Sequence, residues 1–207
     1  TEKEIENSPL ERVLQVAHPG DPWKMGGGHT QNLKYETNTA SDIYKYITTT
    51  TTQNGITKSD VSLAPGQTYP AGTLFKNTVK DEDGNQVVEF RNAKDQVLLL
   101  RKILDANTHI DTYYVYNEYD QLAFILPPKA IHKPITEDLL DTLCYQYRYD
   151  GFGRQAQKRL PGRDDWESVV YDAADRPVLT QDVNLKNKGL WLLTKYDAFG
   201  RVAYTGL

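Results

Sequence analysis

One short turn motif recurs along the chain and constrains its fold more than any other feature. The motif has Asp or Asn, two variable residues, Gly or Asp, and then a polar side chain. Its six copies begin at Asp81, Asn92, Asn117, Asp150, Asp172 and Asp197. An Asp or Asn that opens a type I turn accepts backbone N–H groups two residues on, and Gly or Asp tolerates a left-handed fourth position. Each copy therefore predicts the tip of a β-hairpin.

The sequence on both sides of these turns alternates with the period of a strand. Tyr145, Tyr147 and Tyr149 fall on one face of an extended chain, and Gln146 and Arg148 fall on the other. Similar alternation precedes other copies at 112–116, 169–171 and 190–196, and short strands are expected after the turns at 97–100, 122–126 and 202–204. Successive copies begin 11, 25, 33, 22 and 25 residues apart. Alternation around turn signals favours a repeated hairpin over six unrelated surface turns.

The predicted fold class is therefore all-β, with consecutive antiparallel β-hairpins in a curved, twisted sheet over residues 76–207. Residues 127–142 form an insertion that interrupts the pattern with three prolines. Thr136, followed by two acidic residues, predicts one short helix near 136–142. Residues 1–75 are expected to form a loop-rich N-terminal segment with short strands, among them 32–38 and 42–52, that packs on the first hairpins.

Composition excludes several classes of protein. Mean hydropathy is -0.63 and apolar runs are only a few residues long, whereas a membrane helix needs about 20 apolar residues. The net charge of -4 has both signs interspersed, which argues against a nucleic-acid partner because that would require a clustered basic face. The single cysteine, Cys144, allows no disulfide within the chain. The first ten residues are charged and lack a signal peptide, and the chain is expected to be a piece of a longer protein.

A Tyr-Asp pair, two residues and Gly-Arg, at intervals in the twenties, resembles the motif of the YD-repeat (RHS) family of bacterial and animal surface proteins. Residues 149–154 and 196–201 match it in full, residues 171–176 depart from it at Asp175, and the first three copies lack the Arg. The stretches 8–23, 69–76, 112–130 and 143–162 are similar to the region that precedes the main repeat array of large bacterial RHS proteins. The motif residues, all with an expected structural role, are Tyr116, Asn117, Asp120, Tyr149, Asp150, Gly153, Arg154, Tyr171, Asp172, Asp175, Arg176, Tyr196, Asp197, Gly200 and Arg201.

The resemblance implies a function that is not catalytic. In this family the repeats form β-sheet ribbons that spiral into a hollow shell, which often encloses a C-terminal toxic or variable effector domain, and the proteins are secreted or attached to the cell surface. The implied partners are further YD repeats and such an effector in the same polypeptide, and no cofactor is implied. The alternative is a carbohydrate- or protein-binding module that uses exposed Tyr and Trp. An enzyme such as a glycosidase ranks third, because it would need two carboxylates facing each other across a cleft.

Several residues invite a site, but no catalytic, metal-binding or cofactor-binding residue is predicted. The Gly26-Gly27-Gly28 run lacks the Lys-Ser/Thr and the helix of a phosphate loop, so a surface loop is expected. The dispersed histidines, His18, His29, His109 and His132, have no metal-ligand spacing. Cys144 lies beside an alternating strand without a nearby histidine, which favours a buried structural cysteine over a nucleophile.

Acidic, aromatic and basic residues leave alternatives open. Asp81 and Asp83 could form a weak calcium site, although an EF-hand is excluded because Asn92 stands where Glu is required; the alternative is acids that form turns. Trp23, Trp166 and Trp191 could form a sugar-stacking platform or serve packing. Arg154, Arg176 and Arg201 could form an anion-binding ladder, but a structural role is favoured, in which each pairs with the Asp four residues back or lies across a neighbouring Tyr ring.

Overall fold

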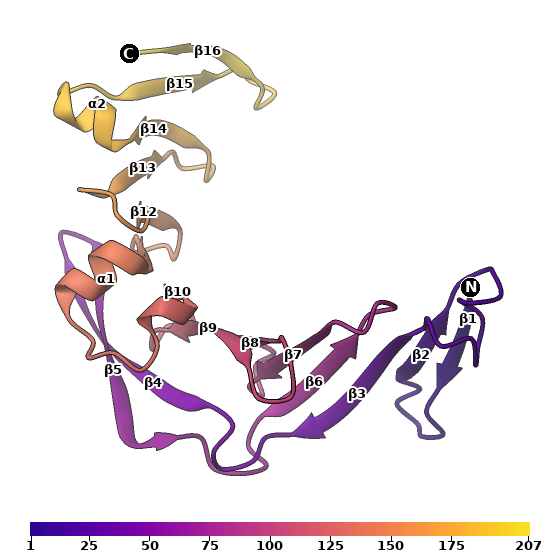
Figure 1. Ribbon diagram of the computed structural model, residues 1–207. Coiled ribbons are helices and arrows are strands. Elements are labelled where there is room, and N and C mark those ends of the chain that lie inside the picture. Colours follow the sequence, from indigo (N-terminus) through magenta and orange to yellow (C-terminus); the bar gives the residue numbers. More distant parts are fainter. The chain divides into compact units, whose positions relative to one another are not determined.

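The computed structural model describes residues 1–207 and is almost entirely β, with 49% of the residues in strands and 7% in helices. Fourteen strands form one sheet in the order β1-β2-β3-β6-β7-β8-β9-β10-β11-β12-β13-β14-β15-β16, and β4 and β5 pair separately. The strands that flank the six turns are β6 (Phe75–Lys80), β7 (Gln86–Arg91), β8 (Val97–Ile103), β9 (His109–Tyr116), β10 (Leu122–Leu126), β11 (Tyr145–Tyr149), β12 (Gln155–Arg159), β13 (Glu167–Tyr171), β14 (Pro177–Gln181), β15 (Leu192–Tyr196) and β16 (Val202–Gly206) (Figure 1). Every residue-level pairing within this sheet is antiparallel, so the predicted class of consecutive hairpins is confirmed.

The first 75 residues are richer in strands than the sequence suggested. They contain β1 (Glu2–Ile5), β2 (Val13–Ala17), β3 (Gln31–Thr37), β4 (Tyr44–Gln53) and β5 (Ile56–Thr68). β3 pairs with β6 at six consecutive positions, from Asn32 opposite Lys80 to Thr37 opposite Phe75. The strands expected at 32–38 and 42–52 are present as β3 and β4. The leading strands continue into the hairpins through an ordinary ladder.

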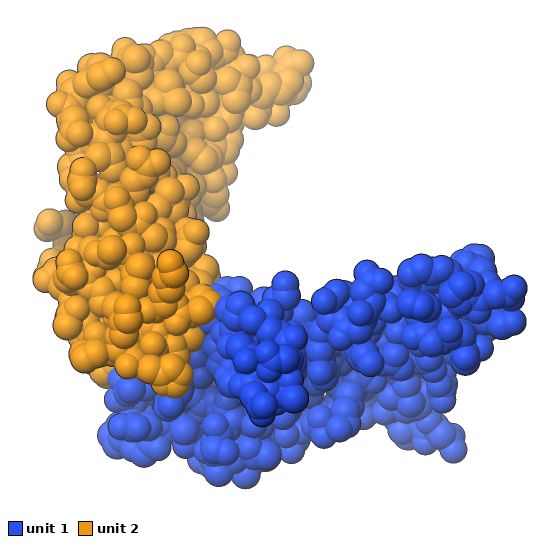
Figure 2. Space-filling view, viewed as in Figure 1, with its two compact units in different colours: residues 1–45, 63–114 blue, residues 46–62, 115–207 orange.

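The chain divides into two compact units, which Figure 2 colours separately. Unit 1 contains residues 1–45 and 63–114, and unit 2 contains residues 46–62 and 115–207. The sequence had placed a division at residue 75 instead. That position lies at the start of β6, inside unit 1, where β6 pairs on one side with β3 and on the other with β7.

In unit 1, buried side chains alternate with more exposed ones along β7 and β9. Val88 and Phe90 on β7 alternate with more exposed neighbours, as do Asp111 and Tyr113 on β9. Phe90 and Leu99 are fully buried and lie opposite each other in the β7–β8 ladder. The buried Asp111 accepts two hydrogen bonds from the guanidinium of Arg101, each 2.8 Å long. This pairing meets the requirement that a buried charge have a partner.

In unit 2, the ladders within hairpins are longer than those that join one hairpin to the next. β13 and β14 pair at four positions, and so do β11 with β12 and β15 with β16. By contrast, β12 meets β13 at two positions, and β14 meets β15 at two. Each hairpin is therefore a local unit, and other contacts must help to fasten it to its neighbours.

Two short helices lie in unit 2. α1 (Glu137–Leu143) occupies the predicted place, and the Thr136 hydroxyl accepts from the Leu139 N–H at 3.2 Å as the expected N-cap. A 3-10 turn, η1 (Pro128–Ala130), precedes it in the insertion. α2 (Val183–Asn187) was not expected, since at most one helix was predicted; Asp182 caps it by accepting from the Leu185 N–H at 2.8 Å. Neither helix is long and apolar enough to cross a membrane.

β4 and β5 form a long hairpin; a strand was expected at 42–52, but its partner was not. Its turn is Asn54-Gly55, with both residues at positive φ, 52° and 77°, which is the signature of the favoured two-residue hairpin loop. In unit 2, this hairpin lies against the motif hairpins: the Thr57 hydroxyl accepts from the Tyr149 N–H at 2.8 Å, and Ile56 bridges to Asp150. Its contacts position one wall of the pocket described below.

Candidate functional site

All six predicted turns form, and they share one hydrogen-bond pattern. At Asp150, for example, Oδ1 accepts the N–H groups of Phe152 and Arg154, each at 2.9 Å, and the Gly153 N–H donates to the Asp150 carbonyl oxygen at 3.0 Å. The fourth residue is left-handed in every turn. The φ values are 88° at Gly84, 62° at Asp95, 63° at Asp120, 79° at Gly153, 59° at Asp175 and 79° at Gly200. The acids of the motif are thus used as turn formers.

The first and fifth residues of each turn are complementary in hydrogen-bonding capacity. Where the turn opens with Asp, the fifth residue donates: Arg176 Nε donates to Asp172 Oδ2 at 2.8 Å, and the same contact joins Arg154 to Asp150 and Arg201 to Asp197. Where the turn opens with Asn, the direction of this side-chain hydrogen bond is reversed: the first residue donates and the fifth accepts. Asn117 Nδ2, for example, donates to Gln121 Oε1 at 2.9 Å. In the copies at Asn92 and Asn117, the missing Arg is therefore matched by Asn at the first position. At Asp81 the first residue is unchanged, and Asn85 Nδ2 donates to Asp81 Oδ2 at 2.8 Å.

The Tyr that precedes a turn fastens its hairpin to the hairpin before it. The Tyr171 hydroxyl donates to the carbonyl oxygen of Gln155 at 2.8 Å. The hydroxyl of Tyr196 donates to Pro177 O at 2.8 Å, and that of Tyr149 to Leu122 O at 2.7 Å. In all three cases, the acceptor directly follows the motif of the preceding hairpin. These bonds lie near the turns, where the short ladders between hairpins have ended.

The motif arginines add a second contact in the same direction. The Arg154 guanidinium lies 4.9 Å from the ring centroid of Tyr171, and that of Arg176 lies 4.7 Å from the ring of Tyr196. Arg154 also pairs with Asp175 of the next hairpin at 2.7 Å. Arg201 instead lies over Phe199 of its own turn, and three quarters of its side chain is exposed. Arg154 and Arg176 are thus engaged with neighbouring hairpins rather than arranged as an open anion ladder.

The electrostatics of the turns do not suit acid–base catalysis. The hydrogen bond from the Arg176 side chain, followed by that from its backbone, lowers the pKa of Asp172. Backbone hydrogen bonding from Arg201 likewise lowers the pKa of Asp197. A general acid or base at neutral pH requires a shift in the opposite direction. The turn acids therefore remain ionised and structural.

Aromatic side chains project from three of the turns in unit 2. Phe152 is 85% exposed, Phe199 84% and Tyr119 61%, and each occupies the third position of its turn. Phe152 lies 4.8 Å from the Arg154 guanidinium. The tips at Phe152 and Phe199 thus combine an exposed ring with a guanidinium, while the Tyr rings of the strands are used between hairpins.

The other residues singled out in the sequence do not form a shared site. Gly27 is held in a tight turn, where an added Cβ would lie 2.6 Å from the carbonyl oxygens of Asp21 and Pro22. His18 lies 3.5 Å from Glu82 Oε1, and His29 Nδ1 is 3.1 Å from Glu82 O. No three His, Cys, Asp or Glu side chains converge in a metal-binding arrangement. Both carboxylate oxygens of Asp81 are bonded within its turn.

Cys144 is fully buried after α1. Burial raises the pKa of its thiol to about 11. A reactive cysteine requires a lowered pKa and access to solvent. Cys144 is therefore a packing residue, as the sequence suggested.

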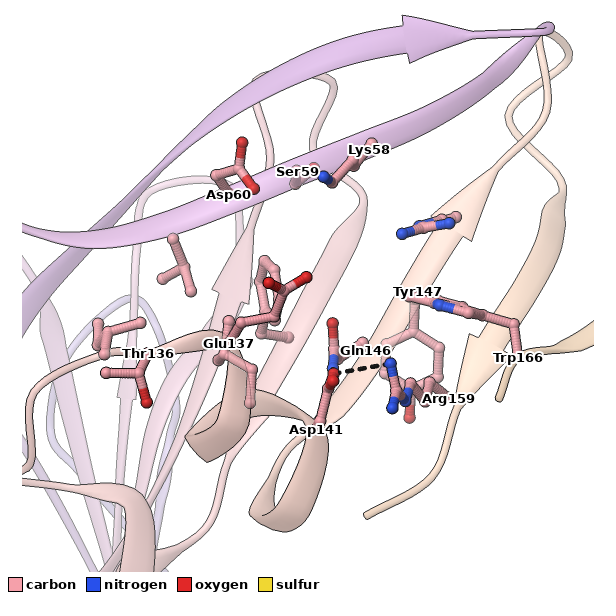
Figure 3. Close-up of a pocket in the computed structure, with 15 residues that line it drawn as sticks. Lys58, Ser59, Asp60, Thr136, Glu137, Asp141, Gln146, Tyr147, Arg159 and Trp166 are labelled. Atoms are coloured by element: carbon pink, nitrogen blue, oxygen red, sulfur yellow. Dashed lines mark hydrogen bonds and ion pairs between the residues drawn. The ribbon is translucent and has the colours of Figure 1, made fainter. Parts of the chain in front are cut away.

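A pocket of about 320 Å³ lies within unit 2, between β5, α1 and the β11–β12 hairpin. Figure 3 shows β5, with Lys58 and Asp60, along one side, Glu137 and Asp141 on α1 below it, and Trp166 and Arg159 on the far side. Asp141 pairs with Arg159 at 2.8 Å and accepts from Gln146 at 2.9 Å. Arg148 also lines the pocket, with its guanidinium 3.7 Å from the Trp166 ring. Among the residues that line the pocket, only Trp166 was considered as a ligand-binding residue from the sequence; Gln146 and Arg148 were assigned only to one face of a strand.

The fold and its turns define an all-β protein in which six hairpins share one turn type. Among known families, the one described as Domain of unknown function (DUF6443) matches residues 1–37, which carry β1, β2 and β3. The match ends before the first of the six turns. No curated protein matches the chain.

Proposed function

We propose that the chain is a non-catalytic structural section of a large secreted or cell-surface RHS/YD-repeat protein. In this role it forms part of the wall of a β-sheet shell that encloses a C-terminal effector domain. Its partners are then further hairpins and the effector of the same polypeptide. The proposal extends the motif resemblance of residues 149–154 and 196–201 to the whole chain.

One observation carries the proposal. Each of the last three hairpins contacts its predecessor through the same Tyr hydroxyl and the same acceptor position. Two of these junctions also have an Arg over the next Tyr ring. A junction that is repeated in this way can be extended by further copies, and stability in such arrays comes from interfaces between neighbours. This is the behaviour required of a wall section.

The alternative of a binding module that stacks ligands on Tyr and Trp has less support. The Tyr rings of the motif lie under arginines or between hairpins, and Arg148 lies over the Trp166 ring. Ligand stacking would have to displace these contacts. The structural role requires no such rearrangement.

The test is electron microscopy of the full-length gene product that contains this chain, combined with limited proteolysis. The proposal predicts a hollow particle in which the part after residue 207 resists protease until the wall is denatured. An open, elongated particle, or a following part that is cleaved at once, would refute it. Surface labelling of intact cells and assay of the medium check the proposed location.

A further inference from the structure

Arg148 is unusual among the arginines of the chain. Seven of the nine pair with a carboxylate: Arg12, Arg91, Arg101, Arg154, Arg159, Arg176 and Arg201. Arg163 is exposed to solvent and needs no partner. Arg148 is half-buried, and its one hydrogen bond is a long contact, 3.3 Å, from Nη1 to the neutral Gln157 Oε1. Burial and the adjacent guanidinium of Arg159 lower its pKa, and Asp60 and Asp141 do not offset this effect.

The surroundings of Arg148 hold its guanidinium in place but do not supply hydrogen-bond acceptors for most of its N–H groups. The Trp166 ring, 3.7 Å away, covers one face of the group, and stacking of this kind leaves the N–H edge free. A guanidinium carries five N–H donors in a plane, a geometry that matches a carboxylate. Asp141, the nearest candidate on α1, is already paired with Arg159. Asp60 also acts on the charge of Arg148 but forms no ion pair with it, so the N–H edge is open to an anion.

The pocket beside Arg148 fits a small, hydroxyl-rich molecule. Its volume of about 320 Å³ is at the lower end of the roughly 300–1,000 Å³ found for small-molecule sites. Asp60 and Glu137 on its rim make no ion pair and can accept hydrogen bonds, while Lys58 can donate them. Sugar hydroxyls both donate and accept, so they can be paired by either kind of group.

We propose that this pocket binds a carboxylated saccharide of the uronic acid class, with its carboxylate held by Arg148 and its hydroxyls by Asp60 and Glu137. Recognition depends on the charge-assisted pair at Arg148 rather than on stacking against Trp166. The site is independent of the structural role proposed above, because it lies within unit 2 and involves none of the junctions between hairpins. Failure of either proposal leaves the other standing.

The experiment titrates the whole chain with D-glucuronate and follows the Arg148 Nε–H resonance by NMR, with calorimetry for affinity. Three comparison ligands are used: D-glucose, acetate and free glutamate. The expected result is a dissociation constant of about 1 mM for glucuronate, at least about tenfold weaker binding of the others, and a shift of the Arg148 resonance. The variant Arg148→Lys keeps the charge but loses the planar fork, and should weaken binding at least about tenfold. Arg163→Lys, outside the pocket, is the matched control and should bind as the parent does.

The outcomes separate the alternatives. If glucose bound as tightly as glucuronate, the pocket would not recognise the carboxylate. If acetate or glutamate bound as tightly as glucuronate, the pocket would not recognise the saccharide. Either result overturns the proposal. It is also overturned if glucuronate at about 20 mM, well above the expected constant, leaves the Arg148 resonance unmoved. Since this resonance is read in the unmodified chain, the test remains decisive even where Arg148→Lys fails to fold.

Discussion

The Tyr171 hydroxyl donates to the carbonyl oxygen of Gln155, 2.8 Å away on the preceding hairpin. β12 and β13 share only two paired positions, so this bond is a substantial part of the junction between the two hairpins. The Tyr196 hydroxyl makes the same contact one hairpin later. The junctions are therefore built by side chains as well as by the sheet ladder.

The first prediction follows from this bond. Tyr171→Phe keeps the ring under Arg154 but leaves the Gln155 carbonyl without its donor, and it should lower the free energy of unfolding by about 0.5–1.5 kcal/mol. For a chain of this length, a loss of about 1 kcal/mol in the free energy of unfolding lowers Tm by about 2–4 °C. Calorimetry resolves a shift of this size. Tyr145→Phe is the control, because the side chain of Tyr145 is exposed. Equal losses in the two variants would contradict the role given to Tyr171.

The second prediction tests the complementarity of the first and fifth turn residues. Asp172→Asn places an amide N–H against the Arg176 guanidinium, so two donors face each other where the parent has a 2.8 Å bond. Adding Arg176→Gln recreates the pair that Asn117 and Gln121 form. A double-mutant cycle should therefore show that Asp172→Asn costs less in the Arg176→Gln background, with a coupling of about 0.5–3 kcal/mol. Additive losses, measured by denaturant unfolding, would rule the complementarity out.

Much of the fold was predictable because its main signals are local. The side chain and the fourth residue that set each turn, such as Asp150 and Gly153, lie within five positions of each other, so the sequence displays the whole motif. The strand at 42–52 was expected, but its pairing with β5 was not, although Asn54-Gly55 is a strong local signal for a two-residue hairpin. α2 could also have been predicted from Asp182 as cap and Gly189 at its end.

The pocket could not be predicted in the same way. Asp60, Arg148 and Trp166 come from three separate stretches of the chain, and they meet because β5 lies against the β11–β12 hairpin. The unpaired state of Arg148 depends on Asp141 being taken by Arg159. Neither fact has a signature in local spacing or periodicity.

The third prediction concerns acid pH. Hydrogen bonds from the Arg12 side chain, and then from Ser8, hold the pKa of Glu6 at about 2, below the ordinary value of about 4.3. Because the folded-state pKa is lowered, the stability from this carboxylate is fully present above pH 4.3 and is lost as the pH falls towards 2. Glu6→Gln should thus be less stable than the parent at pH 7, and the gap between their urea midpoints should narrow between pH 4 and 2. A gap that stays constant over this range would contradict the assignment.

The fourth prediction separates backbone strain from side-chain crowding at the fourth turn position. Gly153 has φ 79°, and a Cβ there would meet Gln121 Nε2 at an ordinary 3.5 Å, so the cost of Gly153→Ala should be conformational, about 1–2 kcal/mol. Gly153→Asp should cost less, because Asp95, Asp120 and Asp175 occupy the same position at φ near 60° in the other turns.

Gly151 provides the matched control within the same turn. Its φ is not positive and an added Cβ meets nothing within 4 Å, so Gly151→Ala should be neutral or stabilising by up to about 1 kcal/mol through the unfolded state. Denaturant midpoints of the three variants should therefore rank Gly151→Ala highest, Gly153→Asp next and Gly153→Ala lowest. If Gly153→Asp fell below Gly153→Ala, the left-handed preference of Asp would not explain why Gly and Asp share the fourth position. The order of these two midpoints thus decides whether backbone conformation alone selects the residue that closes each turn.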